Sequence, residues 1–361
     1  MKTSLRRDSD GMALIMVMCA IFVLSALAAG FALSMKVETK LAQNANSEQQ
    51  LLWLGRSGVE FARYILSQQA GIASEPYDSL NQKWAGGSGS LAESNSVLSS
   101  ISLDNYPVGD GTVSIKIIDL ERKVNINTAI NPANSQMIQQ ALTLMGVDAN
   151  SISVVSDSIL DWIDADDLPR VAGVESDYYQ GLPLPYYAKN APIDDLSELL
   201  LVKEVTPEMY WGSNATNHTP SVFQHKLGLG TAPGQAPDYP FGLVEIFTPF
   251  SSGRINVNTA DANVLQMIPG VDAAMADAII KLRAGPDGVD GTEDDTPFRN
   301  PAAALQGVGI RNPQSAQLCT ERSLTFEVHV TAQIGDYKRE YVAILYRRTA
   351  TDIQVLSFYW K

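Results

Sequence analysis

The chain has 361 residues and a formal net charge of −14, from 40 acidic and 26 basic side chains. This length allows a membrane segment together with one large domain or two ordinary ones. The acidic balance argues against a nucleic-acid partner, because binding to phosphates needs a basic face. The chain has only two cysteines, Cys19 and Cys319, so we expect no disulfide framework.

An uncharged apolar run of 24 residues, Met12 to Met35, follows a short basic segment that ends at Gly11. At about 1.5 Å per residue, a helix over this run is roughly 36 Å long, enough to cross a hydrocarbon core of about 30 Å. The run is too long for a secretory signal peptide, and no cleavage site of that kind stands out beyond it. We therefore expect a membrane helix, and an ordinary signal anchor is one alternative interpretation of it.

The helical pattern continues without proline to about Gln69. In its far part, apolar residues and one glycine recur at steps of three and four, which is typical of one face of an amphipathic helix: Leu51, Leu54, Gly58, Phe61 and Ile65. This pattern predicts a single helix of nearly 60 residues, whose second half packs against a sheet.

Four strands are expected around this helix. Tyr77 to Ser102 is rich in Gly, Ser and Asn and predicts a loop, after which Gly111 to Leu120 alternates apolar and polar residues as a half-buried strand does. The other three strands lie near the C-terminus, and the first two are joined by a hairpin turn: 324–333, 338–347 and 353–360.

A short sequence occurs twice, as KVNINTA at 123–129 and as RINVNTA at 254–260. The second copy leads through Pro269-Gly270-Val271 into a helix-forming stretch, which is similar to a helix-hairpin-helix unit. Met145-Gly146-Val147 follows the first copy as a looser version, and Val202 to Val205 resembles it again without the glycine. Lys281 and Arg283 would suit phosphate binding, but acidic residues crowd the same unit: Asp261, Asp272 and Asp277. We favour a structural helical module over DNA binding.

Two acidic regions are candidates for a cation site. The loop from Pro286 to Asp295 carries five carboxylates between glycines: Asp287, Asp290, Glu293, Asp294 and Asp295. Carboxylates so close together repel one another unless a cation neutralises them, and calcium accepts about 6–8 oxygens in flexible geometry. We favour calcium here over a solvated acidic loop. A second and weaker candidate is the group of Asp161, Asp164, Asp166, Asp167, Glu175 and Asp177. Asp161 and Asp164 could instead cap a helix end.

The sequence contains no recognisable catalytic set. His218, His225 and His329 stand apart, without the spacing of a zinc site, and neither a nucleophile elbow nor a phosphate loop is present. We therefore expect a protein that is not an enzyme.

The most specific pattern lies between Leu160 and Glu208. It combines LDWIDADD at 160–167, Pro169-Arg170, and ESDYY at 175–179 with Ser197-Glu198-Leu199 and Val205-Thr206-Pro207-Glu208. Together with the N-terminal run and the two NTA segments, this combination resembles the minor pseudopilins of type II secretion systems, in particular the protein K family. The resemblance covers most of the chain.

The resemblance implies an α+β pseudopilin fold. In that fold, a long N-terminal membrane-spanning helix packs on a small antiparallel sheet, and a large α-helical domain is inserted into the sheet. The chain then divides into a prepilin leader (1–11), a transmembrane helix (12–35), its periplasmic continuation (36–70) and the first part of the pseudopilin core (71–121). The remaining parts are the inserted helical domain (122–252), the hairpin-like segment with the acidic loop (253–310) and the C-terminal strands (311–361).

The resemblance also implies processing. A prepilin peptidase would cut between Gly11 and Met12 and leave Met12 as an N-methylated first residue. The protein would cross the bacterial inner membrane once, with a cytoplasmic N-terminus and a periplasmic C-terminal domain. Most pilins carry a Glu at the fifth mature position, which neutralises the amino terminus of a neighbour, whereas this chain has Met16. It is therefore expected at the tip of the pseudopilus, starting or capping assembly for protein export across the outer membrane.

The partners implied by the resemblance are the I-, J- and H-type minor pseudopilins, the major pseudopilin, the prepilin peptidase and the inner-membrane secretion platform, with no nucleic acid. The family also binds calcium in its head domain. Two other interpretations remain open at this point, namely a minor pilin of a type IV pilus system and a membrane-anchored DNA-uptake receptor that uses the hairpin motifs.

Overall fold

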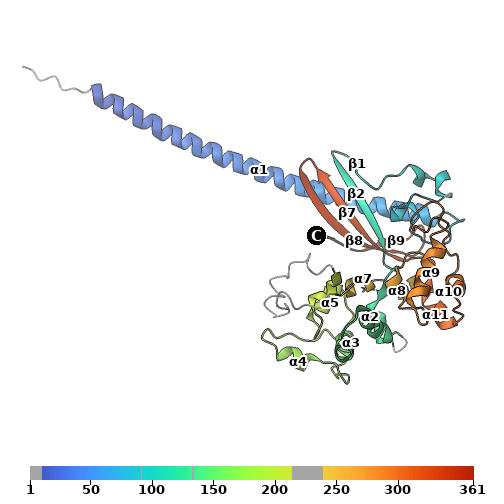
Figure 1. Ribbon diagram of the computed structural model, residues 1–361. Helices are drawn as coiled ribbons and strands as arrows, with labels where there is room; N and C mark the ends of the chain where they lie inside the picture. The colour runs from blue at the N-terminus through green and yellow to red at the C-terminus, as the bar shows by residue number, and fades with distance from the viewer. Residues whose placement is uncertain (1–9, 91, 132–133, 214–238) are drawn as a thin grey trace, which may run out of the picture.

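The computed structural model describes residues 10–90, 92–131, 134–213 and 239–361. Its first element, α1 (Asp10–Ala70), is one helix of 61 residues that projects far out of the head (Figure 1). Residues 12–46 of α1 are exposed, so the described part of the head does not cover the apolar run. The prediction of one long helix is confirmed, whereas most of the expected leader (residues 1–9) lies outside the described residues.

The sheet has five antiparallel strands in the order β1-β2-β7-β8-β9. Their bounds are β1 (Tyr106–Val108), β2 (Gly111–Asp119), β7 (Thr325–Ile334), β8 (Tyr337–Arg347) and β9 (Ile353–Trp360). The four predicted strands are present, and the structure adds the short strand β1. Because β2 pairs directly with β7, the roughly 200 residues between them form an insert within the sheet. The expected α+β fold is therefore confirmed.

The far half of α1 packs on one face of this sheet, and small residues let the two surfaces approach closely. A Cβ atom at Gly58 would collide with the side chain of Val330, and one at Gly55 would collide with the ring of Tyr341. The shared core is apolar, as the alternation in β2 and the helical spacing in α1 predict, and includes Leu51, Leu54, Ile65, Leu66, Val113, Ile115, Ile117, Val328 and Leu345.

The glycine- and serine-rich segment predicted as a loop contains three short 3-10 helices: Lys83–Ala85, Glu93–Asn95 and Val97–Ser100. Trp84 and Leu98 from these turns are buried in the sheet core, and the Trp84 ring meets Phe326 edge to face at 5.3 Å between centroids. The segment thus covers one end of the core, which its composition alone does not reveal.

The insert consists of two parts that start in the same way. In the first, β3 (Val124–Asn125) pairs in parallel with β4 (Phe247–Thr248), and in the second β5 (Ile255–Asn256) pairs in parallel with β6 (Cys319–Thr320). Helices fill each part: the first holds η4 (Ile126–Ile130), α2 (Gln136–Met145), α3 (Ala149–Ile163), α4 (Ser176–Gln180), η5 (Leu196–Leu201), α5 (Pro207–Trp211) and α7 (Leu243–Ile246). The second holds α8 (Ala262–Leu265), α9 (Ala273–Arg283), α10 (Pro301–Gly307) and α11 (Pro313–Gln317).

The asparagines of the two NTA sequences make equivalent hydrogen bonds in the two parts. Asn127 donates from Nδ2 to the carbonyl of Ile193 at 3.0 Å and accepts the Ile193 N–H at 2.7 Å. Asn258 makes the same pair of bonds to Phe298, at 2.9 and 2.8 Å. In each part the asparagine therefore ties the first helical hairpin to a segment 40 to 66 residues later.

The predicted hairpin turns are also repeated. Gly146 and Gly270 adopt positive φ angles of 81° and 91°, and each is followed by Val and then by an Asp that caps the next helix. The segment from Val202 to Val205, which lacks the glycine, turns at Glu204 with a φ of 60°. The corresponding turn in the second part has Gly309, with a φ of 88°. The repeated sequence therefore marks two copies of one unit, which we call a double hairpin because it contains two helical turns of this kind: at Gly146 and Glu204 in the first copy, and at Gly270 and Gly309 in the second. Residues 311–320 belong to the second copy, because β6 pairs with β5, and the main sheet resumes at Thr325.

A buried polar network joins the insert to the sheet. The Asp78 carboxylate binds Arg347 and accepts the Ser323 N–H at 2.8 Å, while Asn256 donates from Nδ2 to the Asp78 carbonyl and to Asp119. Burial raises the pKa of Asp119, and the pKa of the neighbouring Glu121 is raised to about 8 by burial and then by the charge of Asp119. This network fixes the insert at the end of the sheet where the chain enters and leaves it.

Candidate functional site

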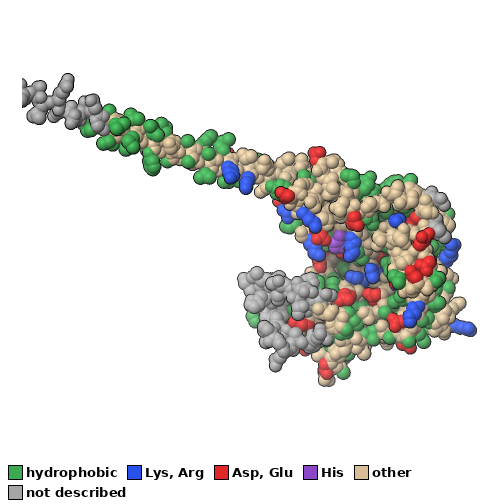
Figure 2. Space-filling model, turned by 45° about the horizontal axis from the view of Figure 1, so that its top comes forward, with side chains coloured by type: hydrophobic (Ala, Val, Ile, Leu, Met, Phe, Trp, Pro, Cys, Tyr) green, Lys and Arg blue, Asp and Glu red, His purple; other side chains and the backbone are tan. Residues whose placement is uncertain are grey.

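The apolar half of α1 is one candidate functional element. Among the described residues, α1 is the one helix long and apolar enough to cross a membrane. Met12 and Met16 lie on its exposed surface, at 66% exposure each, and no Asp, Glu, Lys or Arg occurs from Met12 to Met35. Figure 2 shows this apolar surface along the projecting part of the helix. The structure describes the backbone of Gly11 within α1.

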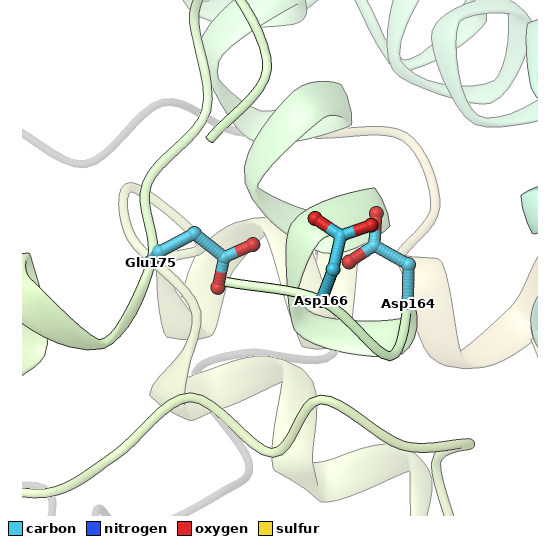
Figure 3. Close-up of side chains that lie close together, drawn as sticks. All are labelled: Asp164, Asp166 and Glu175. Carbon is cyan, nitrogen blue, oxygen red and sulfur yellow. The ribbon is translucent and has the colours of Figure 1, made fainter. Parts of the chain in front are cut away.

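A group of three carboxylates at the end of α3 is the second candidate. The ligand oxygens of Asp164, Asp166 and Glu175 lie within 4.8 Å of one another (Figure 3). Asp164 ends α3 as its C-cap residue, and Asp166 follows in the loop. Glu175 returns to the same place just before α4, as its N-cap residue. This group, which we call the acidic triad, belongs to the cluster that the sequence offered as the weaker candidate.

Glu175 is the unusual member of the acidic triad. It is only 5% exposed, and neither of its carboxylate oxygens has a hydrogen-bond partner in the described part of the chain. Oδ1 of Asp164 is buried and unpartnered in the same way. Burial, and then the charges of Asp161, Asp164, Asp167 and Asp166, raises the pKa of Glu175 to about 7. Buried carboxylate oxygens without donors are suited to a bound cation, because ionised carboxylates are costly to bury alone.

The neighbouring Asp161 is neutralised within the chain. It is buried, its carboxylate accepts the backbone N–H of Arg170 at 3.1 Å and Nη1 of Arg170 at 2.7 Å, and the same Nη1 also binds Asp164. Burial nevertheless raises the pKa of Asp161. The backbone passes so close here that a Cβ atom at Gly173 would collide with the Asp161 carboxylate. Arg170 therefore closes one side of the acidic triad.

The last two members of the predicted cluster lie outside the acidic triad. Asp167 is exposed, and hydrogen bonds from Ser176 and Asn190 lower its pKa. Asp177 lies in the first turn of α4 and contributes no ligand atom to the triad. Of the six predicted carboxylates, the structure thus brings three together and binds a fourth, Asp161, to the arginine beside them.

The loop from Pro286 to Asp295, which the sequence favoured, is arranged differently. Asp290 forms a two-pronged ion pair with Arg283, at 3.0 Å from Nε and 2.7 Å from Nη2. Asp295 accepts the N–H groups of Gly291 and Thr292, and Asp294 accepts the Thr292 hydroxyl at 2.8 Å. Asp287 accepts the N–H of Val289, and Glu293 is exposed. The loop places four of these five carboxylates on donors of its own chain, and among the described residues it forms no group of three converging ligands.

His329 is not isolated, although the sequence gave that impression. On β7 its Nε2 lies 2.6 Å from Glu327, and its Nδ1 lies 3.0 Å from Glu340 on β8. Hydrogen bonding to Glu327 is the main cause that raises the pKa of His329. The hairpin register explains the cluster, because Glu340 lies diagonally across from His329. His218 and His225 lie outside the described residues.

Comparison with protein families gives two matches. A family model described as type II secretion system, protein K, matches residues 117–212, a range that contains the acidic triad and the first double hairpin. A helix-hairpin-helix motif matches residues 251–290, which cover the second copy of the first hairpin and the first half of the acidic loop. The helix-hairpin-helix unit predicted from the turn at Pro269-Gly270-Val271 is therefore confirmed.

Curated relatives named type II secretion system protein K resemble the chain over different lengths. The chain is 24% identical to the protein from Pseudomonas aeruginosa over 363 residues, covering 98% of this chain and 93% of that protein. It is 30% identical to the protein from Pectobacterium carotovorum over 117 residues, which is 29% of this chain and 35% of that protein. The protein from Aeromonas hydrophila is 24% identical over 56% of this chain and 61% of its own length.

Among solved structures, the chain resembles one in the crystal structure of the GspK–GspI–GspJ complex from the type 2 secretion system of enterotoxigenic Escherichia coli. The TM-score is 0.61 at 18% identity, over 89% of this chain and 99% of that chain. At this identity the likeness shows the fold, including the insert within the sheet.

Proposed function

The chain belongs to the protein K family of type II secretion systems, and we propose that this minor pseudopilin occupies the tip of the pseudopilus, where it starts or caps assembly. The observation that carries the proposal is Met16, which stands in a membrane segment without a single carboxylate. In a packed bundle of such segments, a Glu at this position would neutralise the amino terminus of a neighbour in a medium where an unpaired charge is costly. A subunit without it lacks the partner group for a subunit above.

The insert supports the same position. The insert between β2 and β7 adds two double hairpins to a sheet of five strands. It lies next to this sheet, at the end of α1 opposite the membrane segment (Figure 1). In the proposed pseudopilus, the α1 helices of successive subunits would lie side by side. A mass of this size would be easier to accommodate at an end of such a fibre than within its shaft.

We further propose that a prepilin peptidase cuts between Gly11 and Met12 and that Met12 becomes N-methylated. In this arrangement the N-terminus is cytoplasmic, α1 crosses the inner membrane once, and the head is periplasmic. The apolar, exposed run from Met12 to Met35 supports the single span. Protein export across the outer membrane would then be the process that the pseudopilus serves.

The proposed partners are the I-, J- and H-type minor pseudopilins, the major pseudopilin, the prepilin peptidase and the inner-membrane platform. The similar chain was crystallised in a complex named for K, I and J components, which supports the first two. The long exposed surface of α1 from residue 12 to residue 46 offers the length along which other helices can pack. The family is structural, and we propose that this chain likewise has no enzymatic activity.

Calcium is the proposed cofactor. Of the two predicted regions, the acidic triad fits a hard cation better, because Asp164 and Glu175 present buried oxygens that no donor of the described chain satisfies. Asp164, Asp166 and Glu175 would hold the ion, which would join the end of α3 to the start of α4. The loop 287–295 remains the second proposed region, although its own N–H groups, the Thr292 hydroxyl and Arg283 already bind four of its five carboxylates.

The helix-hairpin-helix match makes DNA binding the second function to test. In the structure Asp272 caps α9 by accepting the Met275 N–H at 2.8 Å, and Asp148 caps α3 in the equivalent place. A carboxylate at the helix start repels the phosphate that such a hairpin would bind. We expect no shift in fluorescence anisotropy when the protein is titrated into duplex DNA at physiological salt.

The test of the tip position begins with the mass of the mature N-terminus, which should correspond to methylated Met12. Met16→Glu should then restore the missing carboxylate and let the subunit enter the shaft, so that labelled protein is found along sheared pseudopili. Met16→Gln is the matched control, because it adds polarity without charge. Wild-type protein found along the shaft, or still carrying residues 1–11 in a working secretion system, would contradict the proposal.

A further inference from the structure

A cavity at the far end of α1 gathers three arginines in an otherwise acidic protein. Its volume is about 290 Å³, and it lies between the end of α1, the segment before β7 and the turn that joins β8 to β9. The residues that line this cavity, which we call the arginine pocket, are Ala70, Arg322, Ser323, Leu324, Arg347, Arg348, Thr349 and Ala350. Three of its eight lining residues are arginines, although the whole chain has a net charge of −14.

Arg347 supplies a buried donor to this pocket. Its side chain is 3% exposed, its Nη2 binds Asp78 and donates to the Ser323 carbonyl at 2.8 Å, and its guanidinium lies 4.8 Å from the centre of the Phe326 ring. Nη1 is also buried and has no hydrogen-bond partner in the described part of the chain. Arg347 therefore places a buried guanidinium beside the cavity, with one nitrogen that no acceptor of the described chain satisfies.

The other two arginines are available from the surface. The side chain of Arg348 is 64% exposed, and its one ion pair, with Asp352, has a long distance of 3.6 Å. Arg322 is exposed and has no carboxylate of the described residues within 4.0 Å of its guanidinium. Among the described residues, Asp78 and Asp352 are thus the carboxylates that contact the three guanidiniums, which leaves one positive charge in excess. A water molecule could satisfy Nη1 of Arg347, but only an anion would also neutralise the positive charge in excess.

We propose that the arginine pocket binds an oxyanion, which is a carboxylate or a phosphate group. Guanidinium groups bind the planar pair of oxygens of a carboxylate, or two oxygens of a phosphate, through two parallel hydrogen bonds. The buried Nη1 of Arg347 provides the inner contact, and Arg322 and Arg348 close over the ligand from outside. Binding there fixes Arg347, which also holds the buried network between the sheet and the insert.

The oxyanion can come from two sources. One is a small free anion. The other is a carboxylate side chain of a protein packed along α1, because a shallow hollow of about 230 Å³ lies next to the pocket and shares Ala350 with it. That hollow follows the exposed side of α1 through Glu60, Tyr64 and Ser67. A neighbouring subunit in this hollow would reach the arginine pocket, and this second source rests on the proposed function.

The first arm of the test uses the full chain in detergent micelles and inorganic phosphate, at constant ionic strength set with chloride. Wild-type protein should bind phosphate with a stoichiometry of one in calorimetry and should unfold at a higher temperature in its presence. Arg322→Gln and Arg348→Gln should each weaken binding by roughly tenfold or more, because each removes a charged donor. Arg311→Gln removes the same charge outside the pocket and should bind as the wild type does. Arg347 is left intact, since its loss would disturb the fold.

The second arm adds the I- and J-type pseudopilins. If a partner carboxylate fills the pocket, the complex no longer binds phosphate, and the double variant Arg322→Gln/Arg348→Gln forms the complex roughly tenfold more weakly. If the ligand is a free anion, phosphate binds the complex and the isolated chain equally well. The proposal is overturned if the double variant matches the wild type both in phosphate binding and in complex formation. A chain that forms no such complex contradicts the proposed function but leaves the first arm intact.

Discussion

The acidic triad and the loop 287–295 contain the same kind of residue in opposite surroundings. In the triad, Glu175 and one oxygen of Asp164 are buried with no donor in the described chain. In the loop, Asp290 binds Arg283, and the carboxylates of Asp287, Asp294 and Asp295 accept N–H or hydroxyl groups from the loop itself. The denser run of acidic residues in the sequence is therefore the better satisfied one.

This difference shows that the number of carboxylates in a segment does not decide whether it binds a cation. What decides is whether the fold leaves oxygens that are buried, close together and without a donor. The loop turns on itself at Gly288 and Gly291, which have φ angles of 71° and 93°, and its own N–H groups then point at its carboxylates. The triad is assembled from two segments separated by Arg170, and no backbone N–H of the described chain reaches Glu175.

The largest expected effect comes from removing the Arg283 side chain, which neutralises Asp290 of the loop. Arg283 is 3% exposed and donates to the carbonyls of Val257 and Ala260 as well as to Asp290. Arg283→Met leaves these buried acceptors and the carboxylate unpaired, and we expect it to lower the free energy of unfolding by about 3 to 5 kcal/mol. Denaturant unfolding of the full chain would measure this.

Arg283→Lys is the control for charge alone. A lysine restores one positive charge but cannot bind Asp290 through two nitrogens while donating to both carbonyls, so only part of the loss should be recovered. If Arg283→Met unfolded at the wild-type denaturant concentration, the loop would not depend on its ion pair, and the contrast with the triad would disappear.

The next largest effect is the proposed stabilisation by calcium. A cation that binds only the folded chain adds about 2.7 kcal/mol at a concentration of 100 times its Kd, which should appear as a higher Tm with calcium than with a chelator. Asp164→Asn and Glu175→Gln should each abolish this rise. Asp177→Asn is the matched control, because it removes a nearby exposed carboxylate that contributes nothing to the triad, and it should keep the full rise.

A smaller effect concerns pH in the absence of calcium. The pKa of Glu175 is raised to about 7 in the folded chain, so between its ordinary value and 7 the folded state binds more protons than the unfolded state. Stability should therefore fall as pH rises through this range. Glu175→Gln should remove that slope and make the chelated protein more stable at pH 8 than the wild type. A slope that persists in Glu175→Gln would assign the titration to another group.

Most of the fold follows from the sequence because its signals are local and periodic. The uncharged run and the spacing of Leu51, Leu54 and Ile65 predict α1, and the alternation of apolar and polar residues predicts β2 and β7. The strand β1 escapes this reasoning, since three residues that include Pro107 have no period to detect. The burial of Trp84 escapes it as well, because a glycine-rich segment gives no sign of which of its residues will turn inward.

The candidate site could be predicted only in part, for a physical reason. The sequence identifies the six carboxylates between Asp161 and Asp177, but whether they converge depends on how the loop after α3 returns to α4. Arg170 could have been recognised as a neutralising partner, because it stands among these acids. The partners of His329 become visible only when β7 is paired with β8 in the right register, because that register brings Glu340 to the ring. The sequence predicts the hairpin but does not by itself give this register.

The smallest expected effect separates the two acidic regions most directly. Asp294 is exposed, and hydrogen bonding by the Thr292 hydroxyl lowers its pKa, so it already has a donor before any cation binds. Asp294→Asn and Glu293→Gln should therefore leave the calcium-dependent rise in Tm at its wild-type size, while the same rise is absent in Glu175→Gln. If Asp294→Asn also removed the rise, calcium would bind the loop as well, and the loop would have to release Asp294 from Thr292 to do so. Calcium titrations of the three variants, read by Tm and by calorimetry, would decide whether one region or both hold the ion, because a second ion would also change the stoichiometry.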